Sequence, residues 1–151
     1  MLSRIGLGRR LLKDRRNPRL LCNRYIDNIY MLGTGSLSFP KSRRITRTSE
    51  FERVKQHGYA ERGRLMTLSV LAMKNAGPCR AGLITTRAIG SATIRNRIRR
   101  CLREIVRKHQ HDLREDFWIV LIARRDAASA GYRPLEDEWL RLAKRASILA
   151  L

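Results

Sequence analysis

A chain of 151 residues with 43% hydrophobic content is long enough for one domain with a modest core. Its 33 lysines and arginines, 27 of them arginine, exceed the 13 acidic residues and give a net charge of +20. Because so large a charge repels itself in a compact fold, it favours a polyanionic partner, with RNA or DNA first and an anionic membrane second, over a protein that acts without one.

Residues 1–40 differ in composition from the rest of the chain. Residues 1–30 are arginine-rich with short apolar clusters, and MLGTGSLSFP at 31–40 has the composition of a linker. This predicts a basic, disordered extension over 1–40, followed by one RNA-binding domain over 41–151. A transit peptide is the alternative for the extension, but Asp14 and Asp27 interrupt it.

The domain is predicted to begin with a short helix over about 48–57. Ser49 stands three residues before Glu52, which is a capping-box spacing, and Gly58 follows as a stop.

Strands are expected next. Residues 65–72 alternate, with Thr67 and Ser69 on one side and a second set on the other: Met66, Leu68, Val70 and Ala72. KNAGP at 74–78 predicts a turn, RAGLITT at 80–86 a second strand, and 59–64 a further, weaker strand.

Residues 91–109 predict an amphipathic helix that Ser91 caps. Its apolar stripe consists of Ile94, Ile98, Cys101, Leu102 and Ile105. The opposite face collects Asn96, Arg99, Arg100, Arg103 and Arg107. Glu104 is the only acid between 87 and 109, whereas a solvated helix face normally mixes both signs of charge. The excess of one sign indicates a surface that binds phosphates.

The last elements are a buried strand over 116–124, a loop over 125–132 and a helix that opens at Pro134. The apolar face of that helix consists of Leu135, Trp139, Leu142, Ala146 and Leu149. The order of helix, two or three strands, helix, strand and helix predicts an α+β or α/β fold.

Residues that could carry bond chemistry are sparse. The three cysteines, Cys22, Cys79 and Cys101, form no CxxC motif, which argues against a zinc site and fits a reducing cytoplasm. The sequence also has no apolar run of the ~20 residues that a membrane span needs. The acids at 112–116 and 136–138 have the pattern of helix-end and surface charges, and no histidine stands near an obvious nucleophile. The side chains of this chain are therefore not expected to break bonds themselves.

GSATIRNRIRRCLRE at 90–104 resembles the signature helix of the bacterial ribonuclease P protein subunit. The matching positions are Arg87, Gly90, Ala92, Arg95, Asn96, Arg97, Arg99, Arg100, Arg103 and Glu104. RITRTSEFERVKQHG at 44–58 is similar to the opening helix of the family, and IVLIAR at 119–124 to its last strand, so the resemblance covers roughly 43–149.

The resemblance implies an α+β fold in two layers, in which three helices and a four-stranded sheet follow the order α-β-β-β-α-β-α. It also implies a left-handed β-α-β crossover through the 91–109 helix. General handedness rules alone predict the opposite, because about 98% of such crossovers are right-handed.

The resemblance further implies a cytoplasmic protein, monomeric and in a 1:1 complex with a catalytic RNA, that assists removal of the 5′ leader from precursor tRNA. The RNA would use Mg²⁺, with no metal site on the protein and no membrane partner. The catalytic RNA would dock on Arg87, Arg95, Asn96, Arg97, Arg99, Arg100, Arg103 and Arg107. The leader would lie between the first helix and the sheet, at Phe51, Lys55, Met66, Ser69 and Arg124.

Three positions depart from the family pattern. Lys55 and Ser69 stand where relatives often carry aromatics, and Ala88 replaces one of two turn lysines. Leader binding is therefore expected either to depend more on charge than on stacking or to be weaker. Plain core packing remains the alternative role for Phe51. A structural RNA-binding protein, such as a ribosomal protein, is the alternative function, and a protein-only nuclease is a third that no carboxylate cluster supports.

Overall fold

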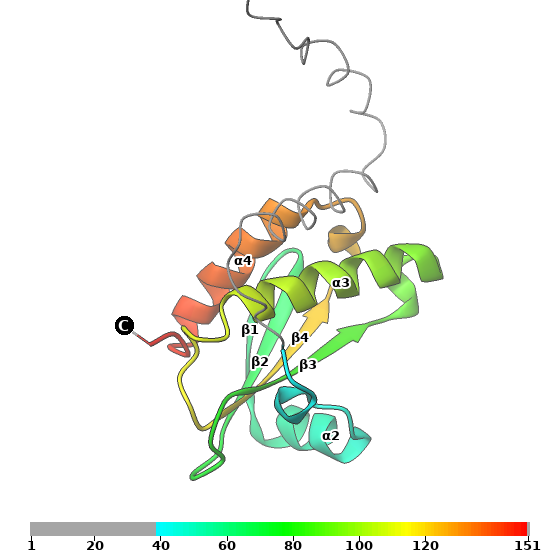
Figure 1. Ribbon diagram of the computed structural model, residues 1–151. Coiled ribbons are helices and arrows are strands. Elements are labelled where there is room, and N and C mark those ends of the chain that lie inside the picture. Colours follow the sequence, from blue (N-terminus) through cyan, green and yellow to red (C-terminus); the bar gives the residue numbers. More distant parts are fainter. Residues whose placement is uncertain (1–38, 151) are drawn as a thin grey trace, which may run out of the picture.

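The structure is a computed structural model that describes residues 39–150 (Figure 1). Most of the predicted extension lies outside these residues. The helices are α2 (Thr48–His57), α3 (Ala92–Lys108) and α4 (Tyr132–Arg145). The strands are β1 (Tyr59–Arg62), β2 (Met66–Ala72), β3 (Arg80–Thr85) and β4 (Phe117–Ala123). Short 3₁₀ turns are η1 (Lys41–Arg43), η2 (Arg87–Ile89) and η3 (Arg125–Ala128).

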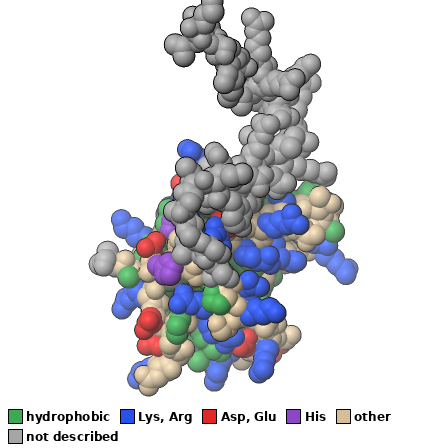
Figure 2. All heavy atoms as spheres, viewed as in Figure 1, with side chains coloured by type: hydrophobic (Ala, Val, Ile, Leu, Met, Phe, Trp, Pro, Cys, Tyr) green, Lys and Arg blue, Asp and Glu red, His purple; other side chains and the backbone are tan. Residues whose placement is uncertain are grey.

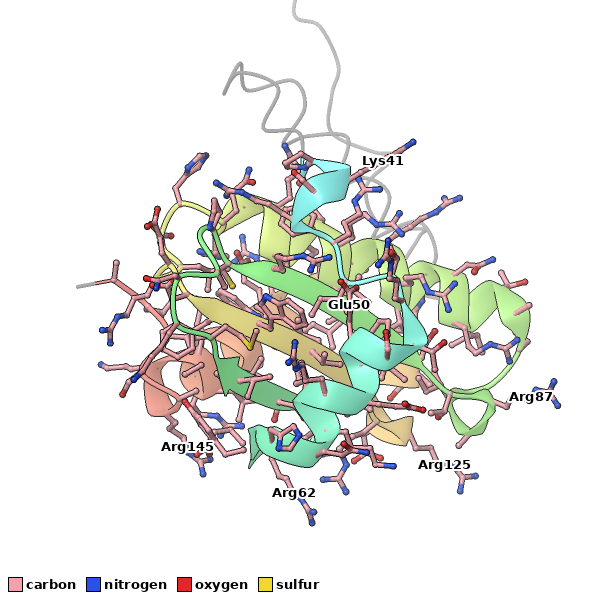
Figure 3. All side chains as sticks on the ribbon, turned by 90° about the horizontal axis from the view of Figure 1, so that it is seen from below. Lys41, Glu50, Arg62, Arg87, Arg125 and Arg145 are labelled. Atoms are coloured by element: carbon pink, nitrogen blue, oxygen red, sulfur yellow. The ribbon has the colours of Figure 1, made fainter. Side chains whose placement is uncertain are left out.

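The four strands form one mixed sheet in the order β1-β2-β4-β3. β2 pairs antiparallel with both β1 and β4, and β3 pairs parallel with β4, with Ala81 opposite Ile119. α3 and α4 cover one face of the sheet and α2 crosses the other (Figures 1 and 3). This is the predicted α+β order, with the weak strand at 59–62 as a true element.

α3 carries the chain from β3 back to the parallel strand β4, and both views place this connection on the side that makes it left-handed (Figures 1 and 3). The prediction from family resemblance is confirmed against the general preference for right-handed crossovers. The crossover leaves β3 at the edge of the sheet.

Two apolar clusters hold the layers together. The larger lies between the sheet and α3 and α4, and includes the fully buried side chains of Met66, Ile98, Leu102, Leu121 and Trp139. The smaller lies under α2 and consists of Ile45, Val54, Leu71, Trp118 and Val120. β2 is thus covered on both faces along part of its length, because Leu71 points toward α2 while Met66, Leu68 and Val70 point toward α3 and α4.

The predicted bounds of α2 are confirmed, but two predictions about helix starts need correction. The capping carboxylate of α2 is Glu50, not Glu52. Its Oε2 accepts from the backbone N–H groups of Thr46 at 3.2 Å and Arg47 at 3.3 Å, so Ser49 lies inside the helix. α4 begins two residues before Pro134, which a first helical turn tolerates because its N–H groups have no intrahelical partner.

No helix among residues 39–150 is long and apolar enough to cross a membrane.

Candidate nucleic-acid interface

α3 exposes its basic side chains because its apolar positions fix its orientation on the sheet. Ile98, Cys101, Leu102 and Ile105 are buried, as the helical periodicity predicts. Ser91 precedes the helix, and its Oγ accepts from the N–H of Ile94 at 3.5 Å, so the predicted cap is present. The arginines consequently lie outside the core, and Figure 2 shows lysine and arginine side chains gathered over this helix.

Asn96, Arg100 and Arg103 form the exposed centre of that surface. They follow the spacing i, i+4 and i+7, which places three side chains in one row along the helix. Within residues 39–150 none of the three is engaged by an acid or a hydrogen-bond acceptor. We call these three residues the α3 row. Arg87, on η2, is exposed beyond the beginning of the helix.

The next arginines are half-buried and each is held by a hydrogen bond. Arg95 Nη1 donates to the carbonyl of Gly90 at 2.8 Å, and Arg99 Nη2 donates to Thr85 Oγ1 at 2.7 Å. Arg97 donates to the carbonyl of Ala128. Because a guanidinium has five N–H donors, the bonds of Arg95 and Arg99 orient these two side chains and leave further donors for phosphate oxygens.

Arg107 differs from the rest of the predicted set. Its Nε donates to Glu104 at 2.9 Å, and the two side chains are only 14% and 7% exposed. Glu104 is thus buried and paired. The structure therefore places Arg107 in a largely buried ion pair and not on the exposed face that the helical wheel predicted.

Phe51 lies on the opposite side of the sheet, between α2 and β3. A Cβ atom built on Gly82 would stand 2.5 Å from Phe51 Cε1 and 3.1 Å from Ile45 Cβ. The ring therefore packs directly on the strand backbone, and glycine is required beneath it. The side chain is half-buried, so it contributes to the smaller cluster and also presents a surface to solvent.

Beside α2 the sheet is only partly covered. Thr67, Ser69, Ile84 and Ile122 share this face and are half-buried, and we call them the open sheet face. Lys55 is exposed one helical turn after Phe51. Thr67, Ile84 and Ile122 were not among the predicted leader-binding residues, although the alternation along the strands would have identified them.

Met66 does not belong to this face. Its side chain is fully buried on the α3 and α4 side of the sheet, so its prediction as a leader-binding residue is wrong. The reason is the two-residue period of a strand, which turns Met66 away from Thr67 and Ser69.

Arg124 is exposed at the end of β4, beside the turn between β1 and β2. Its Nη1 donates to the carbonyl of Gly63 at 2.9 Å and its backbone N–H to Leu65 at 2.8 Å. Arg62, Arg87 and Arg125 project outward around the same side of the molecule (Figure 3). This side therefore combines apolar half-buried strand residues with a basic margin.

Glu138 of α4 holds the β1–β2 turn in place. Its carboxylate accepts from the N–H groups of Arg64 at 2.7 Å, Leu65 at 2.6 Å and Met66 at 3.2 Å. The side chain is 5% exposed and also pairs with Arg141 at 2.8 Å. The prediction of 136–138 as surface charges is thus wrong for Glu138, and Glu136 is buried as well.

Glu50 links the chain before α2 to β3. Its carboxylate pairs with Arg80 at 2.8 Å, and the Arg80 guanidinium lies over the Trp118 ring, 4.9 Å from the centroid. Burial by itself would raise the pKa of Glu50, but the hydrogen bonds from Arg80 and from the N–H groups of Arg47 and Thr46 hold that pKa below its ordinary value.

Glu136 occupies a similar site beside α3. It accepts from Lys108 Nζ at 2.7 Å and contacts His109 Nε2 at 3.0 Å, while the His109 ring stacks on Trp139. Burial would raise the pKa of Glu136, but Lys108 and His109 hold it below the ordinary value. Residues 39–150 contain no group of three side chains suited to bind a metal ion.

Comparison with known proteins identifies the relatives of this chain. The family model described as Ribonuclease P matches residues 39–147. The ribonuclease P protein component of Syntrophomonas wolfei is 34% identical over 112 residues, which are 73% of this chain and 92% of that protein. The corresponding protein of Halalkalibacterium halodurans is 31% identical over 109 residues, 72% of this chain and 92% of that one.

A solved structure of the Staphylococcus aureus RNase P protein is similar in fold, with a TM-score of 0.68 at 24% sequence identity. The match covers 73% of this chain and 100% of that chain.

Proposed function

The chain belongs to the bacterial ribonuclease P protein family, and on this premise we propose that it serves tRNA 5′ maturation as the accessory subunit of an enzyme whose catalytic subunit is RNA. The α3 row carries the proposal: three exposed side chains in one line, on a helix with a single acid that is itself buried and paired. Such a surface binds a polyanion and has no group that would cut one.

The catalytic RNA is proposed to dock on α3 and η2. Asn96, Arg100 and Arg103 supply the exposed donors, with Arg87 beyond the beginning of the helix. Arg95, Arg97 and Arg99 flank them with side chains already oriented by hydrogen bonds. Preorganised guanidinium groups lose less side-chain entropy when they bind phosphates.

The leader of the precursor tRNA is proposed to bind the open sheet face beside α2. Phe51 offers the edge of a ring there, and Lys55 and Arg124 offer charge, whereas Ser69 provides only a small polar group. Unpaired RNA binds such surfaces through stacking and through electrostatic attraction of its backbone. Trp118, the other aromatic side chain on this side of the sheet, is buried and lies under Arg80. With Phe51 as the aromatic side chain left to stack, electrostatic attraction is the larger contribution.

Mg²⁺ is proposed to bind the RNA subunit and to activate the water that cleaves the phosphodiester. The buried carboxylates support this assignment, because each is already engaged. Glu104 and Glu136 pair with basic side chains, and Glu138 accepts backbone N–H groups as well as Arg141. The residues of this chain then bind and orient the two RNAs. The protein is proposed to act as a monomer, in a 1:1 complex with the catalytic RNA in the cytoplasm.

The test is reconstitution with the full chain, the cognate RNA and a precursor tRNA. The protein alone should cleave nothing, and it should lower the Mg²⁺ concentration at which the RNA reaches half of its maximal cleavage rate. No change in that concentration would contradict the proposal.

Sequencing of the RNA that copurifies with the protein separates the alternative. A structural RNA-binding protein of the ribosomal kind would bring down ribosomal RNA, whereas the proposed subunit brings down one catalytic RNA.

A further inference from the structure

A pocket of about 250 Å³ lies between the segment that precedes α2, the edge strand β3 and α3. Its walls include the apolar side chains of Phe39, Leu83 and Val106, and its rim carries Arg44, Arg99 and Arg103. Pockets for small molecules usually measure about 300–1,000 Å³, so this one is sized for a single flat ring system.

The charge of the pocket has one sign. No acidic residue lines it, and Arg103 has no acceptor among residues 39–150. Arg44 Nη2 donates to the carbonyl of Phe39 at 2.7 Å, while its Nε is buried without a partner. The rim thus holds guanidinium donors that are not fully used, which suits an anion that carries several acceptor oxygens.

The strand edge adds directional groups. The N–H of Ile45 donates to the carbonyl of Ala81 at 2.9 Å, on the side of β3 away from β4. By the alternation of a strand, the peptide groups of Leu83 face the same way. A wall with one donor and one acceptor, next to an apolar surface, matches the polar edge and the flat face of a nucleobase.

We propose that this pocket receives one unpaired nucleotide of an RNA partner, with its base against Leu83 and Val106 and its phosphates at Arg44, Arg99 and Arg103. The proposal rests on the proposed function, since Arg103 also belongs to the α3 row and an RNA bound along that row passes the pocket mouth. The chain's own residues 1–38 are the other possible occupant, but they hold eight basic residues against two acids and would be repelled by the rim.

The first test fills the pocket without changing charge. Leu83→Phe in the full chain is compared with wild type and with Leu140→Phe, a matched change at another half-buried leucine, on α4. Affinity for the catalytic RNA and for precursor tRNA is measured by filter binding. The reactivity of each base toward dimethyl sulfate and of each 2′-hydroxyl toward an acylating reagent is mapped in both RNAs.

Wild type should protect one unpaired nucleotide, and the RNA in which it lies identifies whether the catalytic RNA or the leader supplies it. Leu83→Phe should restore the reactivity of that nucleotide and weaken binding of that RNA about tenfold, as expected for the loss of one base contact. Leu140→Phe should do neither, and the salt dependence should be unchanged in both variants.

A second pair guards against misfolding of Leu83→Phe. Arg103→Gln and Arg100→Gln remove equal charge from the same row, but only Arg103 lines the pocket. Both should weaken binding, and only Arg103→Gln should expose the protected nucleotide. The pocket assignment is overturned if folded Leu83→Phe binds within twofold of wild type with an unchanged protection pattern, or if both arginine variants expose the same nucleotide. In either case an unaltered stimulation of cleavage by wild type would leave the proposed function intact.

Discussion

Replacement of Arg100, Arg103 or Arg107 by glutamine should divide the arginines of α3 into two classes. Arg100 and Arg103 are exposed in the α3 row, whereas Arg107 is 14% exposed and pairs with Glu104. The first two substitutions should change how RNA binding depends on salt. The third should lower the stability of the fold and leave the salt dependence unchanged.

The expected magnitudes follow from the number of charges that meet phosphates. Each phosphate contact contributes about 0.7–0.9 to the slope of log affinity against log salt, so Arg100→Gln and Arg103→Gln should each flatten the slope by that amount. Over a fourfold change in salt, this is about a threefold smaller loss of affinity per arginine. Arg107→Gln instead leaves the buried carboxylate of Glu104 without its cation, which typically costs about 3–5 kcal/mol of unfolding free energy.

The slope is measured by filter binding to the catalytic RNA between about 50 and 200 mM monovalent salt. Over this range of salt, phosphate contacts change the affinity strongly. Urea unfolding followed by circular dichroism gives the stability of each variant. A slope for Arg107→Gln that flattens as much as that for Arg103→Gln, at unchanged stability, would refute the division. Unchanged slopes for both Arg100→Gln and Arg103→Gln would mean that α3 is not the docking surface.

Four further predictions concern stability and reactivity. Glu138→Gln removes the anionic acceptor of three N–H groups and should lower the unfolding free energy by about 2–3 kcal/mol in urea; a loss below about 1 kcal/mol would mean that other acceptors replace it. Gly82→Ala should cost about 1–3 kcal/mol because its Cβ meets the Phe51 ring, and the added change Phe51→Leu should recover part of that loss in a double-mutant cycle; strictly additive effects would contradict the contact. The pKa of Glu136 is lower in the folded than in the unfolded state, so the stability that its ionised form contributes is complete above the unfolded value of about 4.3 and is lost as pH falls through the folded value. Glu136→Gln should therefore make the unfolding free energy fall less steeply at acidic pH, and an unchanged pH dependence would exclude this role. Burial raises the pKa of the Cys79 thiol to about 12, so iodoacetamide at pH 8 should label this residue only after unfolding. Peptide mapping checks this, and labelled Cys79 in the folded protein would contradict it.

The orientation of α3 could be predicted from the sequence because it depends on local periodicity alone. Apolar residues at helical spacing define the buried side, and the arginines follow from it. The same reasoning fails for Arg107, since Glu104 lies within one turn of it and forms a pair that a helical wheel does not weigh.

Met66 and Glu138 show two different limits of prediction. Strand alternation alone predicts that Met66 faces away from Thr67 and Ser69, whereas the family resemblance groups it with the leader-binding residues. The burial of Glu138 could not be predicted from local sequence, because the backbone N–H groups that donate to its carboxylate lie 72–74 residues earlier in the chain. The left-handed crossover likewise came from family resemblance, since local sequence carries no signal for it.

The Glu138 contact also imposes an order on biosynthesis. The β1–β2 turn leaves the ribosome 72–74 residues before its carboxylate partner. At about 5–20 residues per second, that interval lasts about 4–15 s, during which these N–H groups are without the carboxylate that accepts from them in the folded protein. The first hairpin of the nascent chain is therefore completed by its last helix. Translation that stops before residue 138 yields a chain in which the β1–β2 turn lacks this acceptor.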